Sequence, residues 1–342
     1  MTTLTNPFSG FPIHQNLAGK RPVAVMIDGH PKAIPQSGLA QADMVFSAEV
    51  EDSVLRYLGI FYGLLPDQVG PIRSVRPYFI EWALAYQPFL IHCGGSPQAI
   101  QQLARDLPLF DVDYIYLINR KGSVKPLTGL RCFERRKDKQ PPHNLYVDLP
   151  RFREEMTLKH AARMKQSFPD SLQKEFGQFS AFEEIPHRDG RLPEGKPALS
   201  VEVLRGWKQK VRYDYRESDN KYVRWVGTFR HWGKLEPHMD QNTGGQIAVD
   251  NLVLLMARSR RITGDLKKRL EIGVMDEGEA VYFVDGKTIS GRWLKINADM
   301  AIRFFDSSGR RFHFNRGNIW IEVISKTACV CVKPSRKSGR RK

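Results

Sequence analysis

The sequence has few cysteines and no long uninterrupted apolar run. Among its 342 residues there are four cysteines. The pair Cys329 and Cys331 does not have the spacing of a zinc site, so we expect four free thiols in a reducing compartment. The longest apolar stretch, 247–257, contains polar residues and is shorter than the roughly 20 residues of a membrane-spanning helix. The first residues show neither a secretory signal nor a cysteine that could take a lipid. The sequence as it stands therefore predicts a cytoplasmic protein without a transmembrane segment.

Acidic residues are too few to balance the basic ones. The chain has 53 Lys and Arg against 37 Asp and Glu, which gives a net charge of +16 at pH 7. Six of the positive charges lie in the last ten residues, 333–342, which have the pattern of a solvated tail. Most of the excess therefore belongs to the rest of the chain. Such a charge attracts anionic membranes, RNA or wall polymers in a salt-dependent way, but charge alone predicts no specific nucleic-acid binding.

Composition and hydrophobic pattern predict a two-domain α+β protein. Hydrophobic residues make up 41% and charged residues 26% of the chain, as in globular proteins. The first half combines strand patterns, such as 113–119, with helical patterns at 78–87 and 98–106, whereas the second half is mostly strands and hairpin turns. We expect a mixed α/β, sandwich-like N-terminal domain followed by a smaller β-rich domain. The expected parts are a leader at 1–20, the N-terminal domain at 21–165, a linker at 166–200, the β-rich domain at 201–326 and a basic tail at 327–342.

The segment 21–38 carries the first candidate site. An apolar strand-like run ends at Asp28-Gly29-His30-Pro31, and ligands of α/β proteins usually meet the sheet at such strand ends. A carboxylate beside an imidazole could orient it, act with it as a general base, or bind a metal. The alternative is turn chemistry, in which Asp28 accepts hydrogen bonds from nearby backbone N–H groups.

The turn Arg73-Ser74-Val75-Arg76 is a second candidate. It precedes a helix expected from Tyr78, so two guanidinium groups and a helix N-terminus could converge on a carboxylate or phosphate. The alternative is that both arginines pair with acids of the protein itself, such as Glu81 or Asp67.

A third candidate is the turn that follows the short strand at 89–92. Its sequence, His92-Cys93-Gly94-Gly95-Ser96, could form an anion cradle at the start of a helix. Ser96 or Cys93 could also be a nucleophile, although the segment lacks the G-x-S-x-G pattern of a nucleophile elbow. The alternative is an ordinary strand-to-helix turn in which Ser96 caps the helix.

Two further histidines lie beside polar residues. His143 stands in a proline-flanked loop with Asn144 and Tyr146, where restricted backbone freedom helps to hold a side chain in place. His238 and Asp240 share a face of an extended segment and could bind a metal, but a third ligand is not evident locally, and a structural pair is the alternative. We therefore predict neither a metal nor a cofactor.

The order of these motifs resembles that of a known family. The segments RPVAVMIDGHPKAIPQSGLAQAD, VGPIRSVRPYF, HCGGSP and PHNLY are similar to the N-terminal domain of the YerB-like bacterial proteins, a domain of unknown function numbered 3048. GGQIAVDNLVLL, DGKTISGRW and RFFDSSGRRFHFNRGNIWIEV are similar to the matching C-terminal domain. The resemblance extends over about residues 6–325. It implies an α+β N-terminal domain with a smaller β-rich partner.

The resemblance also groups residues and suggests a compartment. It implies that residues of the shared motifs belong to one candidate pocket: Asp28, His30, Arg73, Arg76, His92, Ser96, His143 and Asn144. The family is described as lipoproteins of the bacterial envelope, which implies an envelope location if the start of the chain is incomplete. No established reaction comes with the family.

Three functions fit these observations. In the first, an anionic envelope ligand, such as a peptidoglycan or glycan fragment, is bound by Arg73 and Arg76 and accepts hydrogen bonds from His30 and His143. Its predicted ligand-binding residues are Arg73, Ser74, Arg76, Gly94, Gly95, Ser96, Asn144 and Tyr146.

The other two functions use the same chain differently. In a hydrolase or transferase acting on a similar polymer, His30 or His143 would be the general base, oriented by Asp28, with His92 or Ser96 near the reacting atom. In a structural or assembly factor, the aromatic and basic β-rich domain would be a protein interface.

Overall fold

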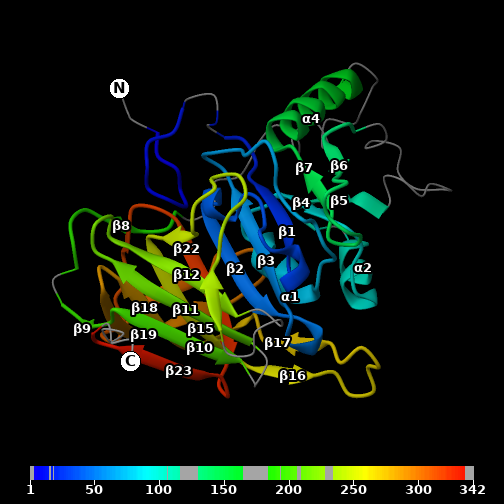
Figure 1. Cartoon of the computed structure of the whole chain (residues 1–342). Helices are drawn as coiled ribbons and strands as arrows, with labels where there is room; N and C mark the ends of the chain where they lie inside the picture. The colour runs from blue at the N-terminus through cyan, green and yellow to red at the C-terminus, as the bar shows by residue number, and fades with distance from the viewer. Residues whose placement is uncertain are drawn as a thin grey trace.

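Strands dominate the computed structural model of the protein (Figure 1). It describes residues 4–14, 17, 19–105, 107–115, 130–164, 184–192, 194–205, 209–227 and 234–335. Helices are few in these residues, so the fold is richer in strands than an even mixture of helices and strands, with both present as the predicted α+β class requires. None of the described helices is long and apolar enough to cross a membrane.

A mixed sheet of eleven described strands, here the large sheet, runs through both halves of the chain. Strand β2 pairs in parallel with β22, from Met44 opposite Ile319 to Ser47 opposite Glu322, so the two halves share one sheet. The strands in order are β20 (Arg303–Asp306), β19 (Lys287–Lys295), β18 (Asp276–Val284), β15 (Asn251–Ala257), β22 (Ile319–Ser325), β2 (Met44–Glu49), β3 (Leu55–Phe61), β1 (Val23–Gly29), β4 (Phe89–His92) and β5 (Phe110–Asp113), with β9 (Lys196–Pro197) paired to β19. The strand expected at 113–119 lies earlier, because β5 ends at Asp113, and residues 116–129 are outside the described part.

Two groups of three neighbouring parallel strands in the large sheet point in the same direction. Strand β3 is antiparallel to both β1 and β2. Strands β15, β22 and β2 are parallel neighbours, and so are β1, β4 and β5. Their carboxyl ends therefore share one side of the sheet, here the carboxyl edge. In α/β proteins this is the edge at which ligands bind.

A second sheet packs against one face of the large sheet (Figure 1). Residues of β11 alternate between buried and half-buried, with Val211 and Tyr213 inward, as a strand with one covered face requires. These side chains share a core with Val25 and Trp320 of the large sheet. The second sheet contains β13 (Leu235–Pro237), β12 (Lys221–Gly227), β11 (Gln209–Arg216), β10 (Ser200–Arg205) and β23 (Cys329–Lys333), with β14 (Ala248–Val249) paired to β12.

Helices pack on both faces of the large sheet. Helix α1 (Pro77–Leu84) packs through Phe79 and Trp82 on the face that carries Met26, opposite the second sheet. Helix α4 (Leu149–Met164) contributes Phe152 to the core on the side of the second sheet. The other described elements are α2 (Pro97–Leu103), the short helices η2 (Pro31–Ala33), η3 (Leu39–Gln41) and η4 (Glu51–Ser53), and the strand pairs β6 (Phe133–Arg135) with β7 (Leu145–Val147), β8 (His187–Arg188) with β21 (Phe314–Asn315), and β16 (Ser259–Arg261) with β17 (Leu270–Ile272).

The four cysteines are free thiols. Cys132 is buried, whereas Cys329 and Cys331 are exposed on β23.

Candidate functional site

Asp28 lies at the carboxyl end of β1 and is fully buried. Its Oδ2 is 2.6 Å from Nδ1 of His143 and 3.0 Å from Nε of Arg73, and its Oδ1 accepts a hydrogen bond of 3.0 Å from the N–H of His30. Burial opposes ionisation, but the bond to His143 and the charges of Arg56 and Arg73 hold the pKa of Asp28 below its usual value. Because an ionised carboxylate only accepts hydrogen bonds, Nδ1 of His143 is the donor. The other nitrogen, Nε2, is left for contacts elsewhere.

His30 and His143 stack on each other. Their ring centroids are 4.7 Å apart and the rings are inclined by 21°. His30 caps η2, where its Nδ1 accepts a hydrogen bond of 3.1 Å from the N–H of Lys32. Burial lowers the pKa of His30, and the neighbouring His143 acts in the same direction although Asp28 opposes it. The side chain of His143 keeps 10% of its surface exposed, so the pair is ordered yet accessible.

Two loops meet the end of β1 and explain why these residues converge. The N–H of Asp28 donates to the oxygen of Pro71 (2.8 Å), and the N–H of Arg73 donates to the oxygen of Met26 (2.9 Å). The loop before α1 is also bonded to the segment of His143, because the N–H of Ile72 donates to the oxygen of Leu145 (2.6 Å). Backbone hydrogen bonds therefore bring Asp28, Arg73 and His143 together from distant parts of the chain.

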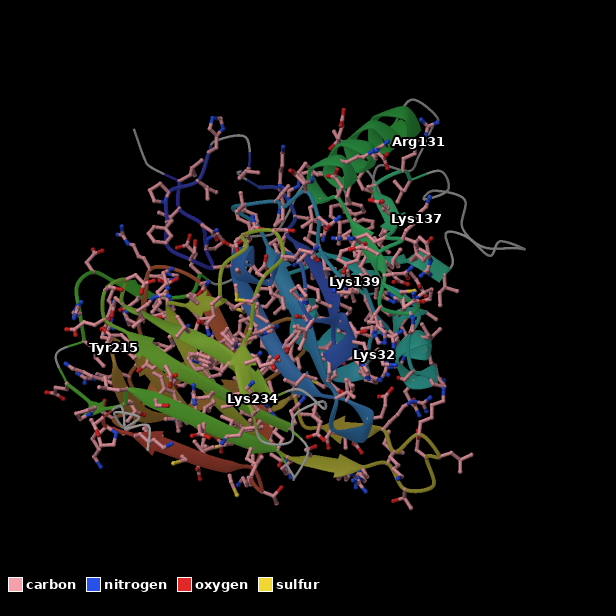
Figure 2. All side chains as sticks on the ribbon, in the orientation of Figure 1. Lys32, Arg131, Lys137, Lys139, Tyr215 and Lys234 are labelled. Atoms are coloured by element: carbon pink, nitrogen blue, oxygen red, sulfur yellow. The ribbon has the colours of Figure 1, made fainter. Side chains whose placement is uncertain are left out.

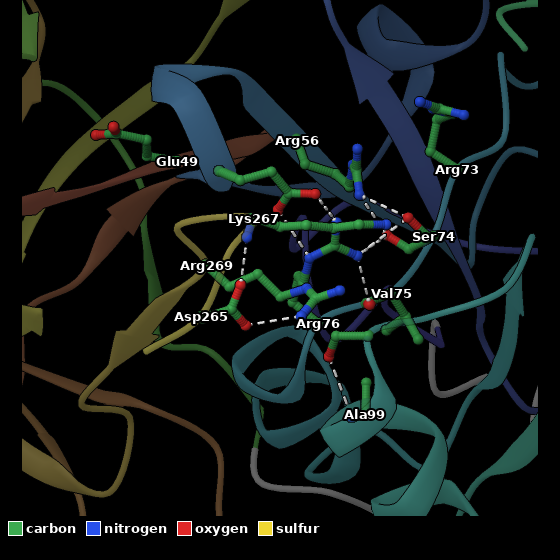
Figure 3. A network of polar contacts seen from close by, with 12 residues as sticks. Glu49, Arg56, Arg73, Ser74, Val75, Arg76, Ala99, Asp265, Lys267 and Arg269 are labelled. Atoms are coloured by element: carbon green, nitrogen blue, oxygen red, sulfur yellow. Dashed lines mark hydrogen bonds and ion pairs between the residues drawn. The ribbon is translucent and has the colours of Figure 1, made fainter. Parts of the chain in front are cut away.

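Arg76 is not part of this group. Its guanidinium donates to both carboxylate oxygens of Glu51 and to Oγ of Ser74 (3.0 Å), and its side chain is only 6% exposed. Arg56 donates to the oxygen (2.7 Å) and Oγ (3.0 Å) of the same Ser74. Burial lowers the pKa of Arg56 to about 10, with Arg76 acting in the same direction. Figure 3 shows this network with Arg73 apart from it. Arg76 thus pairs with an internal acid, Glu51 rather than Glu81 or Asp67.

His92 forms a separate buried ion pair. Its Nε2 is 2.6 Å from Oδ1 of Asp111 and its Nδ1 is 2.9 Å from the oxygen of Gly94. Both partners are acceptors, so both ring nitrogens carry hydrogen. Burial disfavours the charged ring, but the bond to Asp111 and the charges of Asp111 and Asp113 raise the pKa of His92. A buried imidazolium of this kind fixes β4 to β5, and it cannot accept a proton as a general base.

The residues after His92 build a strand-to-helix turn. Gly94 has φ +68°, and its N–H donates to Oδ1 of Asp113 (2.8 Å). Gly95 lies where a Cβ would be 2.9 Å from the side chain of Ile100. Ser96 caps α2 by accepting a hydrogen bond of 3.2 Å from the N–H of Ala99.

Neither candidate nucleophile of this turn is prepared for attack. The hydroxyl of Ser96 is buried and used as a helix cap. Burial raises the pKa of the Cys93 thiol, and the charge of Asp113 adds to this effect, so the thiolate is disfavoured.

Asn144 and Tyr146 support the loop of His143. Oδ1 of Asn144 accepts a hydrogen bond of 2.9 Å from Arg135, and its Nδ2 donates to the oxygen of Arg136 (3.2 Å). The guanidinium of Arg136 lies 5.2 Å from the ring centre of Tyr146. Burial raises the pKa of Tyr146 to about 12, and its buried hydroxyl has no hydrogen-bond partner among the described residues.

His238 and Asp240 bind different partners. Oδ2 of Asp240 accepts from the N–H of Ala40 (3.0 Å), whereas Nε2 of His238 donates to Oε1 of Gln36 (2.7 Å). Arg224 donates to Nδ1 of His238. Burial lowers the pKa of His238 well below its usual value, and Arg224 acts in the same direction. Both contacts of the ring are therefore those of a neutral imidazole.

His238 also connects the second sheet to the end of β1. Nε2 of Gln36, the partner of His238, donates to the backbone oxygen of Asp28 (2.8 Å). No motif in the sequence indicates that Gln36 and Arg224 are the partners of His238. Among the described residues, no group of three or more His, Cys, Asp or Glu could hold a metal ion.

Lysines that sequence analysis did not single out lie near the site. Lys32 lies two residues after His30 and is exposed, and Nζ of Lys139 is 3.3 Å from the backbone oxygen of Ile34. Figure 2 shows Lys32, Lys137 and Lys139 on the same side of the molecule. The charge of Lys32 acts on His30, and Arg56 and Arg73 act on Asp28.

Comparisons with known proteins agree with the fold. Residues 8–162 match the family described as "Protein of unknown function (DUF3048) N-terminal domain", and residues 201–321 match its C-terminal domain. "Putative lipoprotein YerB" of Bacillus subtilis (strain 168) is 27% identical over 324 residues, which are 94% of this chain and 86% of that protein. The crystal structure of the YerB protein from Bacillus subtilis superimposes with a TM-score of 0.74 at 25% identity, covering 96% of this chain and 99% of the other. The chain therefore belongs to the YerB-like family, which is defined by the N- and C-terminal DUF3048 domains.

Proposed function

We propose that the site around Asp28 and His143 binds an anionic ligand of the bacterial envelope, such as a peptidoglycan or glycan fragment. The observation that carries this proposal is the position of Arg73. Asp28 engages only Nε of Arg73, and the side chain is 28% exposed, so its terminal nitrogens remain for a carboxylate or phosphate. With Nδ1 donating to Asp28, Nε2 of the neutral His143 ring can accept a hydrogen bond from a hydroxyl or amide of the ligand beside that anion.

The charge balance of the site favours an anion. One buried carboxylate, Asp28, is offset by Arg73, and the buried Arg56 adds a further positive charge close by. Lys32 and Lys139 extend the positive surroundings toward solvent. The proposed contact set therefore differs from the predicted one, because Arg73 acts with His30 and His143 while Arg76 is engaged by Glu51. The name of the relative as a lipoprotein supports an envelope source for the ligand.

Retention on peptidoglycan tests this proposal. The probe is sonicated peptidoglycan, used in co-sedimentation, with a soluble muropeptide for calorimetry. Arg73→Gln and His143→Gln should each weaken binding about tenfold, the effect of losing one hydrogen bond to the ligand. Arg292→Gln, which removes an exposed arginine of β19 that pairs with Glu277 at 3.5 Å, is the matched control and should retain wild-type binding.

Two outcomes reject the binding proposal. One is that the wild-type protein does not sediment with peptidoglycan even at low salt. The other is that both Arg73→Gln and His143→Gln bind as tightly as the control. Circular dichroism and thermal unfolding of each variant separate lost binding from lost folding.

One observation favours catalysis as a second candidate. The bond between Asp28 and His143 fixes the imidazole with Nε2 as the possible base, which is the arrangement of an oriented general base. In that case the protein is a hydrolase or transferase of a wall polymer. Chromatography of peptidoglycan after incubation should show new fragments that His143→Gln does not release. If the wild-type protein releases no fragments, this candidate is rejected and the binding proposal is unaffected.

A further inference from the structure

A pocket of about 160 Å³ lies at the other end of the carboxyl edge. Its walls include Glu49 at the end of β2, Val323 near the end of β22 and Ala257 at the end of β15. The hairpin of β16 and β17 covers it with Leu270 and Ile272. Cavities of ~150 Å³ in other proteins hold a ring of six carbon atoms. The pocket therefore has room for a small organic molecule, at the place where parallel strands end.

The inner wall of this pocket carries surplus positive charge. Arg205 lines it, is 3% exposed, and donates through Nη2 to Glu322 and to the oxygen of Val323 (3.4 Å). The same Glu322 also binds Arg224 at 3.3 Å, so two buried guanidinium groups share one carboxylate. Nε and Nη1 of Arg205 have no acceptor within the described part of the chain. Buried donors beside a cavity call for an acceptor, and a surplus positive charge favours an anionic one.

The outer wall carries charges of both signs. Arg261 is exposed and Glu49 is half-buried, and neither side chain has an ion pair or hydrogen bond with another described residue. Figure 3 shows the carboxylate of Glu49 away from the network of Arg56 and Arg76. An acid and an arginine without partners at one pocket suit a ligand that itself carries both charges.

We propose that this pocket binds a small zwitterion of the size of an aliphatic amino acid. Its carboxylate contacts Arg205 and Arg261, its ammonium contacts Glu49, and its hydrocarbon part packs on Leu270 and Ile272. The proposal does not rest on the Asp28 site, because β3 lies between β2, which carries Glu49, and β1, which carries Asp28, and no residue is shared.

Matched ligands test the two charges separately. The full chain is titrated by calorimetry with L-leucine, D-leucine, isocaproate, which lacks the ammonium, and isoamylamine, which lacks the carboxylate. At least one leucine enantiomer should bind saturably, and both single-charge analogues should bind about tenfold more weakly, since each lacks one charge-assisted contact. Saturable binding of neither enantiomer up to roughly 10 mM would overturn the proposal.

Variants then assign each charge to a side chain. Glu49→Gln should abolish the preference for leucine over isocaproate, and Arg261→Gln should weaken both ligands about tenfold. Arg258→Gln is the control, because Arg258 is exposed beside the same hairpin, pairs with Asp276 and does not line the pocket. Equal binding of leucine and isocaproate by the wild-type protein would show that Glu49 has no ammonium to bind, and the zwitterion would be wrong.

Discussion

The two ends of the carboxyl edge use their charged side chains differently. Where β1, β4 and β5 end, the charged groups have internal partners: Asp28 lies against Arg73, and His92 is bonded to Asp111. Where β15, β22 and β2 end, Arg205 shares the carboxylate of Glu322 with a second arginine and lies beside a pocket. The polar motifs that stand out in the sequence therefore lie at the end where more charged side chains are paired within the protein. The end with unpaired donors carries no recognisable motif.

Asp28 and Glu322 show the same contrast on the scale of single carboxylates. Both are fully buried, and each is approached by two groups that can be cationic. Glu322 is also bonded to Tyr213 and Trp320, and although burial opposes its ionisation, Arg205 and Arg224 lower its pKa to about 2. Asp28 instead holds groups that reach solvent, since Arg73 is 28% exposed. Glu322 therefore organises buried side chains of the core, whereas Asp28 organises side chains that reach the surface.

Loss of the Glu322 charge is the change with the largest expected effect. Glu322→Gln leaves Arg205 and Arg224 buried without a counter-charge, which should lower the free energy of unfolding by about 3–5 kcal/mol. Urea unfolding followed by circular dichroism measures it. Glu277→Gln is the control, because Glu277 is exposed and pairs with Arg292 at 3.5 Å, and it should change stability by at most about 1 kcal/mol.

A loss below about 1 kcal/mol for Glu322→Gln would contradict this picture. It would mean that the surplus positive charge between the sheets is already balanced. The surplus charge would then no longer support an anion in the neighbouring pocket.

Two buried histidines should give pH dependences of opposite sign. The pKa of His92 is raised in the folded state, so its contribution is complete below the unfolded pKa of about 6.5 and is lost as the pH rises through the folded pKa. The pKa of His238 is lowered well below that value, so its contribution is complete above about pH 6.5 and is lost as the pH falls below it. Each slope is limited to about 1.4 kcal/mol per pH unit for one proton.

Urea unfolding between about pH 5 and pH 8.5 separates the two histidines. The stability advantage of the wild-type protein over His92→Gln should shrink toward alkaline pH. Its advantage over His238→Gln should shrink toward acid pH. Parallel curves for the two variants would show that neither ring titrates differently on folding, and the assigned protonation states would be wrong.

The sequence contains the local half of the site but not its long-range contacts. Asp28 at a strand end, the turn at His92 and the cap at Ser96 follow from short patterns of apolar, polar and glycine residues. The bond from Asp28 to His143 spans 115 positions, and the order of motifs carries no distance information. The use of Arg76 depends on Glu51, which lies in a short turn without a distinguishing pattern.

The shared sheet and the pocket could not be predicted from the sequence, for the same reason. The pairing of β2 with β22 joins residues from opposite ends of the chain, and no local propensity specifies such a partner. Glu322 is recognisable in the sequence as a lone acid in the apolar strand Ile319–Ser325. A lone acid there indicates a buried ion pair, but its partners Arg205 and Arg224 follow only from the packing of the two sheets.

Ser96→Ala should have the smallest effect and still separate support from ligand binding. The hydroxyl of Ser96 accepts one hydrogen bond at the start of α2, so its loss should cost about 1 kcal/mol of stability. Peptidoglycan retention should be unchanged, because Arg73 and His143 are held by other contacts. Ser308→Ala, in an exposed turn, is the control and should shift stability by about 0.5 kcal/mol or less. If Ser96→Ala abolishes retention while the protein stays folded, the turn after β4 contacts the ligand directly, and the β1 and β4 ends then form one binding surface.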